Sequence, residues 1–145
     1  MEFNEIRKEA NKKVLEIMQL INTGIDFEYF FDLDSVQYRV KSSESIINKM
    51  KKVENDIYNV IGIRYIFHDL NNHKQLKDYI VNNPNFKIVE IKNYLQDGHP
   101  EDRNYRALHI RMKYHDFPCE VEFMDVKMAE HVVKTHAEYK NSLLK

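Results

Sequence analysis

The pattern of apolar residues at the start of the chain predicts a helix. Apolar side chains recur there every three or four residues, which places them on one helix face. They are Phe3, Ile6, Ala10, Val14, Ile17 and Ile21. We therefore expect an amphipathic helix over residues 3–22, ended by Gly24. Further helices are predicted over residues 44–52, 69–81 (beginning at Asp69 or Asn71) and 125–143.

The segments between these helices are dense in β-branched and aromatic residues, which is typical of strands. Strands are predicted over residues 36–40, 57–67, 86–95, 105–113 and 120–123. The polar segment 96–103, which contains Gly98 and Pro100, is predicted as a loop. This order predicts an α+β fold, a single domain over residues 1–145 with a mixed sheet of about five strands flanked by helices. We expect helices to cover one face of the sheet and to leave the other partly open.

Polar side chains are concentrated on one face of the last two predicted strands. Every second residue of a strand shares a face, because side chains alternate between the two sides. In the first strand these residues are Tyr105, His109, Arg111 and Lys113, and in the second they are Glu120 and Glu122. An aromatic ring, three cations and two carboxylates on one face suit a nucleotide and its metal ion better than a protein core.

Composition limits the partners of this domain. The chain has 145 residues, of which 43% are hydrophobic and 31% charged, and its net charge is -1. Such a charge provides no overall attraction for nucleic acid or an anionic membrane, so a phosphate site must be a local cluster. The single cysteine, Cys119, excludes an internal disulfide. No segment approaches the ~18 apolar residues of a membrane span. These features predict a cytoplasmic protein without membrane association.

A local cluster of cations lies between residues 39 and 52. Its members are Arg39, Lys41, Lys49, Lys51 and Lys52, accompanied by a single acid, Glu44. Arg39 and Lys41 share a strand face, and Ser45 shares a face of the following helix with Lys49 and Lys52. The start of that helix lies between the two groups, and helix N-termini bind phosphate through backbone N–H groups. The segment is either a phosphate site or a solvated basic helix face.

The predicted strand over residues 57–67 contains a glycine and an arginine among apolar residues. Gly62 predicts a bulge or a close approach of another chain segment. By strand parity Asn59 and Arg64 point to opposite faces, and a bulge at Gly62 would bring them together. An arginine in so apolar a strand needs a partner. Arg64 is therefore either part of a functional site or part of a structural ion pair.

Five motifs carry a resemblance to a known family. They are Arg39-x-Lys41-x-x-x-Ser45-x-x-x-Lys49, the run from Ile57 to Arg64, the run from Tyr105 to His109, Glu120-Val121-Glu122, and the run from His136 to Lys140. In order and spacing, over residues 36–140, they resemble the synthetase domain of the RelA/SpoT family. The resemblance implies a nucleotidyltransferase-like fold. It also implies a pyrophosphokinase that transfers the β,γ-pyrophosphate of ATP to the 3′-hydroxyl of GDP or GTP, making guanosine tetra- and pentaphosphate in the stringent response.

The resemblance further implies a role for each matching residue. The residues that would bind ATP are Arg39, Lys41, Ser45 and Lys49 at the phosphates and Arg64 at the adenine. Those that would bind GDP or GTP are Tyr105 at the guanine, His109 and Lys92. The catalytic residues would be Arg106, His109 and Glu120, with Glu120 also binding Mg²⁺ and accepting the proton of the 3′-hydroxyl.

The chain departs from the family at the metal site. The family's magnesium-binding aspartate is Asn59 here, and an asparagine oxygen can bind a hard cation but brings no charge. Two residues after Glu120, the family's glutamine is Glu122, which adds one negative charge where Asn59 removes one. We therefore expect the Mg²⁺ site to keep its net charge, with Glu120 and Glu122 as its carboxylates and Asn59 as a third ligand.

Two alternatives to a GDP or GTP pyrophosphokinase stay open. Asn93 and Asn104 stand where the family has Asp and Gly, which is compatible with a toxin-like relative that modifies another 3′-hydroxyl, in an adenine nucleotide or at a tRNA end. Asn59 is compatible with a nucleotide-binding module without activity. The expected partners are ATP and GDP or GTP, with tRNA under the first alternative only. The chain ends shortly after Lys140, before the C-terminal helices through which small alarmone synthetases commonly oligomerise, so we expect a monomer or dimer rather than a tetramer.

Overall fold

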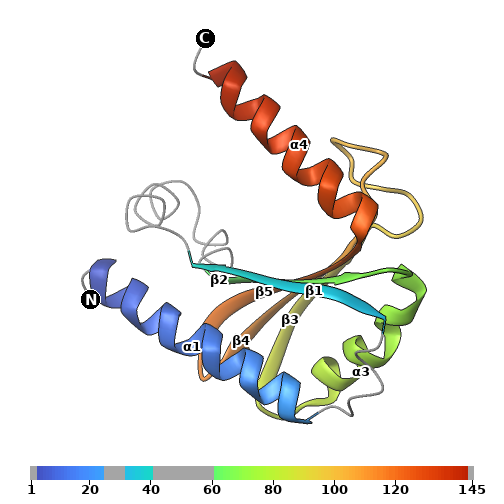
Figure 1. The fold of residues 1–145 in the computed structure, drawn as a ribbon. Coiled ribbons are helices and arrows are strands. Elements are labelled where there is room, and N and C mark those ends of the chain that lie inside the picture. The colour runs from blue at the N-terminus through green and yellow to red at the C-terminus, as the bar shows by residue number, and fades with distance from the viewer. Residues whose placement is uncertain (1–2, 25–31, 41–60, 144–145) are drawn as a thin grey trace.

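The computed structural model describes residues 3–24, 32–40 and 61–143 (Figure 1). Its elements, in chain order, are α1 (Phe3–Gly24), β1 (Leu33–Val40), β2 (Ile61–Phe67), the 3-10 helix η3 (Leu70–His73), α3 (Lys74–Asn82), β3 (Phe86–Asn93), β4 (Leu108–Tyr114), β5 (Phe117–Asp125) and α4 (Val126–Leu143). These elements confirm the α+β fold and the predicted helices near both ends of the chain. The helix predicted over residues 44–52 lies outside the described residues.

The strands form one mixed sheet in the order β1-β2-β5-β4-β3. β2 and β5 run parallel at its centre, whereas the other neighbouring strands are antiparallel. A tight turn joins β4 to β5, and its two residues, His115 and Asp116, have positive φ angles of 46° and 65°. Two successive residues in this conformation are typical of a hairpin turn that matches the twist of its strands. The central parallel pair therefore joins segments that are far apart in the sequence.

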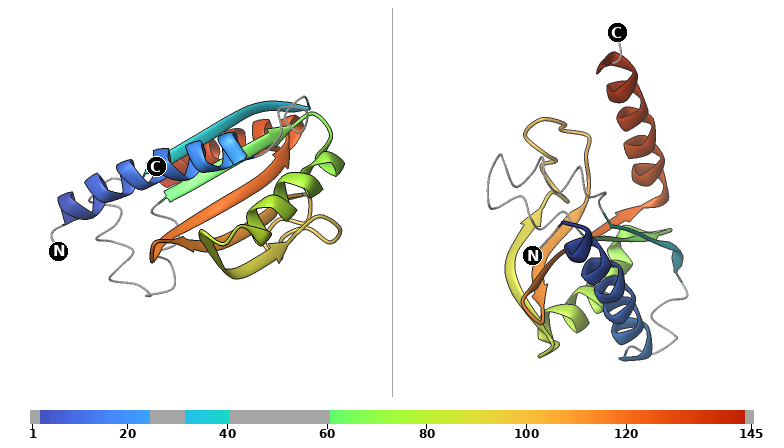
Figure 2. Two further views of the ribbon diagram at one scale, coloured as in Figure 1. Left: turned by 90° about the horizontal axis from the view of Figure 1, so that it is seen from below. Right: turned by 90° about the vertical axis from the view of Figure 1, so that its left-hand side faces the viewer.

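Helices α1 and α3 cover one face of the sheet (Figures 1 and 2). The residues of β4 that point into this layer are Leu108, Ile110, Met112 and Tyr114, all of them buried. The matching stripe of α1 is Ala10, Val14, Ile17 and Ile21, each with 0% exposure. The helical spacing and the strand alternation each supply one apolar face, and burying the two faces against each other forms the core.

Helix α4 follows β5 directly and extends from the other side of the sheet (Figure 1). Asp125 caps it, because its Oδ1 accepts a hydrogen bond of 2.8 Å from the backbone N–H of Met128. A second, smaller apolar cluster forms where the helix leaves the sheet, and its buried residues are Ile66, Ala107, Met124 and Ala129. None of the described helices, α4 included, is long and apolar enough to cross a membrane.

The structure decides between the two alternatives at Gly62 and corrects one predicted strand boundary. The pairing of β2 with both neighbours passes through Gly62 without a shift, so there is no bulge at this residue, and the irregularity lies in β1 between Leu33 and Ser35. Gly62 permits a close approach, the other alternative, since a Cβ at this position would lie 3.4 Å from the Nε of Arg39. The fourth strand also begins later than predicted, at Leu108, so Tyr105 precedes it.

Candidate active site

Cross-strand neighbours on the open face of the sheet form two rows of mostly polar side chains. Residues directly opposite each other on neighbouring strands point to the same face, so the pairing places their side chains side by side. The first row, called the Glu122 row below, is Gln37, Arg64, Glu122, His109 and Lys92. The second, the Glu120 row, is Arg39, Gly62, Glu120, Arg111 and Glu90. Polar residues from all five strands therefore meet on one face.

Strand β5 places two carboxylates at the centre of these rows. Its alternate residues Cys119, Val121 and Phe123 have 0% exposure and face the α1–α3 layer. Glu120 and Glu122 lie between them in the sequence and so face the other side. Their shared face is the one that the sequence predicts. Cys119 is thus a small residue of the core.

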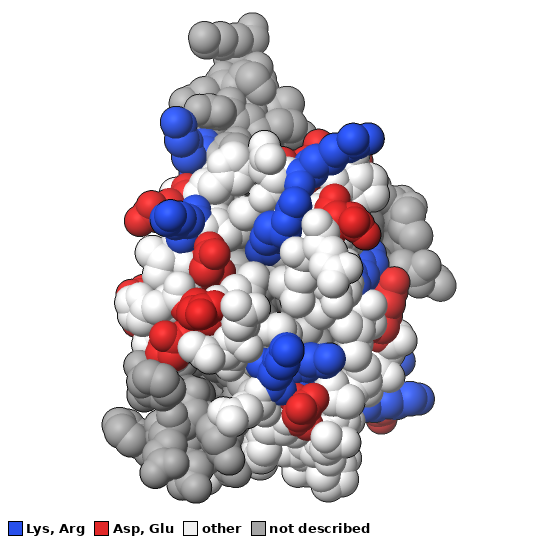
Figure 3. All heavy atoms as spheres, turned by 90° about the vertical axis from the view of Figure 1, so that its right-hand side faces the viewer, with Lys and Arg blue, Asp and Glu red and all other residues white. Residues whose placement is uncertain are grey.

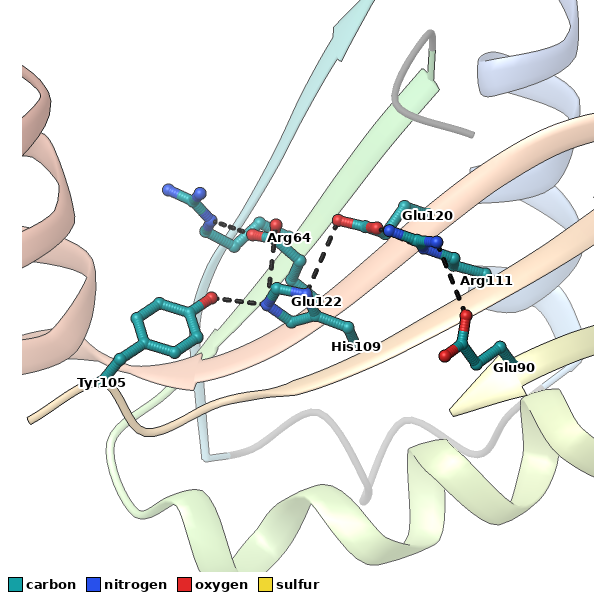
Figure 4. A network of polar contacts seen from close by, with 7 residues as sticks. All are labelled: Arg64, Glu90, Tyr105, His109, Arg111, Glu120 and Glu122. Atoms are coloured by element: carbon teal, nitrogen blue, oxygen red, sulfur yellow. Dashed lines mark hydrogen bonds and ion pairs between the residues drawn. The ribbon is translucent and has the colours of Figure 1, made fainter. Parts of the chain in front are cut away.

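Two arginines form ion pairs with the carboxylates (Figure 4). The Nε of Arg64 lies 2.9 Å from the Oε2 of Glu122. The Nε of Arg111 lies 3.4 Å from the Oε2 of Glu120, and its Nη1 lies 3.5 Å from the Oε2 of Glu90. Arg64 thus takes part in the structural ion pair that the sequence left as one alternative. Arg111 bridges two acids, a role that the sequence did not reveal, because its partners are defined only by the pairing of the strands.

His109 lies between the two carboxylates (Figure 4). Its Nδ1 is 3.7 Å from the Oε1 of Glu120, and its Nε2 is 3.8 Å from the Oε1 of Glu122. The hydroxyl of Tyr105 lies 2.5 Å from the same Nε2 and shares a hydrogen bond with it. The imidazole is therefore held in place from its Nε2 side.

Burial and neighbouring charges shift the pKa values of this group. Burial raises the pKa of Glu120 to about 7, and repulsion from the nearby Glu122 acts in the same direction. Burial also acts to raise the pKa of Glu122, but His109 and Arg64 outweigh it and the pKa is lowered. Burial lowers the pKa of His109, because it disfavours the imidazolium form. The pKa shifts of the two carboxyl groups therefore have opposite directions and favour protonation of Glu120 over Glu122.

His109, Glu120 and Glu122 have the donor atoms of a divalent metal site. One ligand atom from each side chain lies within 4.8 Å of the other two. Mg²⁺ is usually held in proteins by one or two carboxylates together with water and substrate phosphates. The two glutamates therefore fit the Mg²⁺ that the family resemblance implies. Asn59, the third predicted ligand, lies outside the described residues.

An open cavity of about 240 Å³ adjoins the two rows. Its lining includes the cations Arg39 and Arg64, the carboxylates Glu120 and Glu122, and Val133 of α4. Cations and acids thus face a common space large enough for part of a nucleotide. Acidic and basic side chains are also interspersed on the described surface seen in Figure 3. The remaining predicted phosphate ligands, Lys41, Ser45 and Lys49, lie outside the described residues.

An aromatic cluster supports the His109 end of the site. The ring centroid of Tyr94 is 5.8 Å from that of Tyr105 and 5.3 Å from that of His109. The ring of His99 lies 5.0 Å from that of Tyr94, which brings the loop before β4 into the cluster. Of these residues the sequence analysis singled out Tyr105 and His109. A signal for the other two exists, since Tyr94 and His99 are the only residues with an aromatic ring between β3 and Tyr105.

Two further predicted residues lie at the margin of the site. Lys92 is the direct neighbour of His109 on β3, so the Glu122 row contains it. Arg106 precedes β4, and its Nη1 donates hydrogen bonds to the backbone carbonyls of Arg103 and Tyr105. The structure therefore joins Lys92 to the site but holds the guanidinium of Arg106 against the loop.

A comparison with protein families identifies the class of protein to which this sheet and its open-face site belong. The model described as "Region found in RelA / SpoT proteins" matches residues 38–143. This match covers most of the chain and includes every residue of both rows except Gln37. The chain belongs to the RelA/SpoT family.

Individual relatives agree with this assignment. The GTP pyrophosphokinase YwaC of Bacillus subtilis (strain 168) is 28% identical over 87 residues, which are 54% of this chain and 40% of that relative. The crystal structure of the small alarmone synthetase 2 from Bacillus subtilis has a TM-score of 0.79 at 24% identity, covering 98% of this chain and 82% of that one. The small alarmone synthetase 1 from Bacillus subtilis bound to its product pppGpp has a TM-score of 0.63 at 18% identity, covering 98% and 78%. These likenesses confirm the fold implied by the sequence motifs.

Proposed function

We propose that this chain is a pyrophosphokinase that transfers the β,γ-pyrophosphate of ATP to the 3′-hydroxyl of GDP or GTP in the cytoplasm. One observation carries the proposal. His109, Glu120 and Glu122 converge on one point of the open face, beside a cavity lined by Arg39 and Arg64. The site thus combines acids for a metal ion and a proton with cations for phosphates. The names of the relatives support it, since one is a GTP pyrophosphokinase and another binds pppGpp.

In the proposed reaction the 3′-oxygen of the acceptor attacks the β-phosphorus of ATP. The bond between that phosphorus and the oxygen leading to the α-phosphorus breaks, so AMP leaves and the pyrophosphate remains on the acceptor. Glu120 accepts the proton of the 3′-hydroxyl, as a carboxylate with a pKa of about 7 can do at neutral pH. Phosphoryl-type transfer otherwise requires mainly positioning and positive charge around the phosphates.

The donor nucleotide is assigned to the β1–β2 side of the cavity. Arg39 faces this space and would bind the ATP phosphates together with Lys41, Ser45 and Lys49. The guanidinium of Arg64 keeps its Nε on Glu122 and has a planar face that can pack on adenine. Mg²⁺ held by Glu120 and Glu122 would offset the charge of the transferring phosphates.

The acceptor nucleotide is assigned to the β3–β4 side. Tyr105 would stack on the guanine, because aromatic faces bind bases in this way. His109 lies next to Glu120 and would contact the acceptor close to the 3′-hydroxyl, and Lys92, its neighbour in the Glu122 row, would bind acceptor phosphates. Arg106 would reach the phosphates only after its guanidinium leaves the loop carbonyls.

A transfer assay tests the function directly. The protein is incubated with Mg²⁺, γ-labelled ATP and one acceptor at a time (GDP, GTP, an adenine nucleotide or tRNA), and the products are separated. Label on GDP or GTP supports the proposal. Label only on tRNA or an adenine nucleotide would show that the chain uses that acceptor in place of GDP or GTP. No transfer to any acceptor, despite measurable nucleotide binding, would contradict the proposed activity. Glu90→Gln is a matched control for Glu120→Gln, because Glu90 lies in the same row but away from the cavity lining.

A further inference from the structure

We propose that Asp102 and His131 are positioning residues for the acceptor nucleotide. Their contact fastens the loop that carries Tyr105 to helix α4, and this holds the Tyr105 ring in the orientation that stacks on the acceptor base. The inference rests on the proposed function, which assigns the acceptor base to Tyr105. It deepens that function by naming two residues, outside both rows and the cavity lining, on which acceptor binding depends.

Asp102 organises the loop that precedes β4. Its backbone carbonyl accepts hydrogen bonds from the N–H groups of His99 and Tyr105, at 3.1 and 3.0 Å. Its Oδ1 accepts a further hydrogen bond of 3.0 Å from the backbone N–H of Asn104. The second carboxylate oxygen, Oδ2, lies 3.3 Å from the Nε2 of His131. The residue that positions the backbone of Tyr105 is therefore also the residue that contacts α4.

Helix α4 contributes the other half of the contact. His131 lies in the second turn of this helix, and the loop lies beside its start in Figure 1. Met128 and Val132 of the same helix pack against the second apolar cluster, and so does Tyr105. The Tyr105 ring and the first two turns of α4 thus share one packed layer, and the contact between Asp102 and His131 is the polar link between the loop and the helix.

The orientation of the Tyr105 ring depends on the position of the loop. The ring centroids of Tyr94 and His99 lie 5.8 and 6.3 Å from that of Tyr105, with interplanar angles of 68° and 88°. Aromatic contacts of this edge-to-face kind are favourable only over a limited range of geometry. His99 belongs to the same loop, so a loop released from α4 moves both this ring and the backbone of Tyr105. The Tyr105 ring then loses its fixed orientation.

The exposure of the pair determines where its effect should be seen. The side chains of His131 and Asp102 are 40% and 41% exposed, and ion pairs this exposed contribute little to the stability of a fold. The pKa of Asp102 is lowered, first by the backbone N–H of Asn104 and next by His131, so its carboxylate is charged at neutral pH. A ring that is already oriented binds its ligand more tightly than one that binding must order. Loss of the pair should therefore weaken acceptor binding and leave donor binding unchanged.

The first test measures the binding of two nucleotides to the full chain. GDP and a non-hydrolysable ATP analogue are titrated separately by calorimetry with Mg²⁺ present, so that no transfer occurs. His131→Ala should weaken GDP binding about 3- to 5-fold, as expected for loss of an exposed ion pair, without changing binding of the ATP analogue. His131→Gln, whose amide nitrogen can donate to Oδ2, should restore GDP binding to within about 2-fold of the natural chain. His68→Ala is the matched control, because His68 forms a similar exposed contact, at 3.7 Å, with Asp34.

The second test follows Tyr105 without any nucleotide. The ring resonance of Tyr105 is observed by nuclear magnetic resonance in chain labelled with ¹³C-tyrosine and is assigned with Tyr105→Phe. We expect the resonance to shift in His131→Ala and to stay near its natural position in His131→Gln and His68→Ala. Urea denaturation of each variant shows whether the fold itself has changed.

The inference is overturned if GDP affinity and the Tyr105 resonance are both unchanged in His131→Ala. It is overturned equally if both nucleotides bind more weakly and the free energy of unfolding falls with them, since the role of His131 would then be structural. Either result, together with transfer to GDP or GTP by the natural chain, leaves the proposed function standing. A shifted resonance in His131→Ala, in a chain that neither binds GDP nor transfers to any acceptor, contradicts the proposed function but not the positioning of Tyr105.

Discussion

The two faces of the sheet are built from the same strands and obey different physical requirements. On the face toward α1 and α3, β5 contributes Val121 and Phe123, both with 0% exposure. Two residues of the same strand on the opposite face, Glu120 and Glu122, are shielded as well, but by charged and hydrogen-bonding partners. Burial on the first face stabilises the fold, whereas burial on the second concentrates charge and shifts pKa values. Stability and chemistry are thus separated by the alternation of a single strand.

Glu120→Gln should remove the chemistry of the open face and leave the apolar packing on the face toward α1 and α3 intact. We expect transfer activity to fall about 10²–10⁴-fold, because the variant has no base for the 3′-hydroxyl. Circular dichroism should show an unchanged fold. Retention of more than a tenth of the activity would show that Glu120 is not the proton acceptor, and Glu90→Gln gives the background effect of removing a carboxylate from the same row.

Phe123→Ala should destabilise the apolar packing on the face toward α1 and α3. The ring of Phe123 stacks on Tyr65 at a centroid distance of 5.7 Å and lies 6.1 Å from Phe67, so its removal leaves a cavity at the centre of the core. We expect the free energy of unfolding to fall by about 3–5 kcal/mol, measured by urea denaturation. Val133→Ala, on an α4 residue with 62% exposure, should change it by less than about 0.5 kcal/mol. Equal effects of the two would contradict the assignment of the core.

The pH dependence of stability should reveal how much the buried carboxylate of Glu120 destabilises the folded chain. Burial raises the pKa of Glu120 from 4.5 to about 7 in the folded chain, so its protonated form is favoured there. The stabilising contribution is complete below pH 4.5 and is lost as the pH rises through 7. Glutamine mimics the protonated form, so Glu120→Gln should exceed the natural chain in stability by roughly 3 kcal/mol at pH 8 and equal it at pH 4. Urea denaturation in chelator measures this, and a constant difference across the pH range would contradict it.

The Arg64–Glu122 pair should show how much shielding strengthens an ion pair. A double-mutant cycle with Arg64→Met and Glu122→Gln should give a coupling free energy of about 1–2 kcal/mol in urea denaturation. The i,i+4 helix pair between Lys13 and Glu9 of α1, at 3.4 Å and with a Glu9 side chain that is 42% exposed, should give only about 0.3–0.5 kcal/mol. Similar values for the two pairs would mean that water screens the open face as well as it screens a helix surface.

Strand parity predicted what lies on each face, but not which residues meet across strands. Glu120 and Glu122 were correctly placed together, since alternation within one strand depends on sequence alone. The bridging role of Arg111 requires the pairing of β3, β4 and β5, because Glu90 and Glu120 come from separate strands. The register between these strands depends on how their apolar faces pack, and no local pattern in the sequence specifies it.

Tertiary contacts also determine two local features of the strands. At Gly62 the sequence left a bulge and a close approach open, and the structure has the close approach, which makes room for the Arg39 side chain of the neighbouring strand. Tyr105 was predicted inside a strand, but the hydrogen bond from its backbone N–H to the carbonyl of Asp102 keeps it in the loop. Tertiary contacts decided both positions, and propensity did not.

The parallel pairing of β2 with β5 has a consequence for how the chain folds. The partners Arg111 and Glu120 are 9 residues apart, whereas Arg64 and Glu122 are 58 apart. Short loops close at low entropic cost and quickly, and long-range pairing is slower. We therefore expect β4 and β5 to pair early, with His109 and both glutamates already adjacent, and β2 to dock later. A refolding chain would thus hold its metal ligands together before Arg64 and the cavity wall arrive, and a metal ion present during refolding could bind this intermediate.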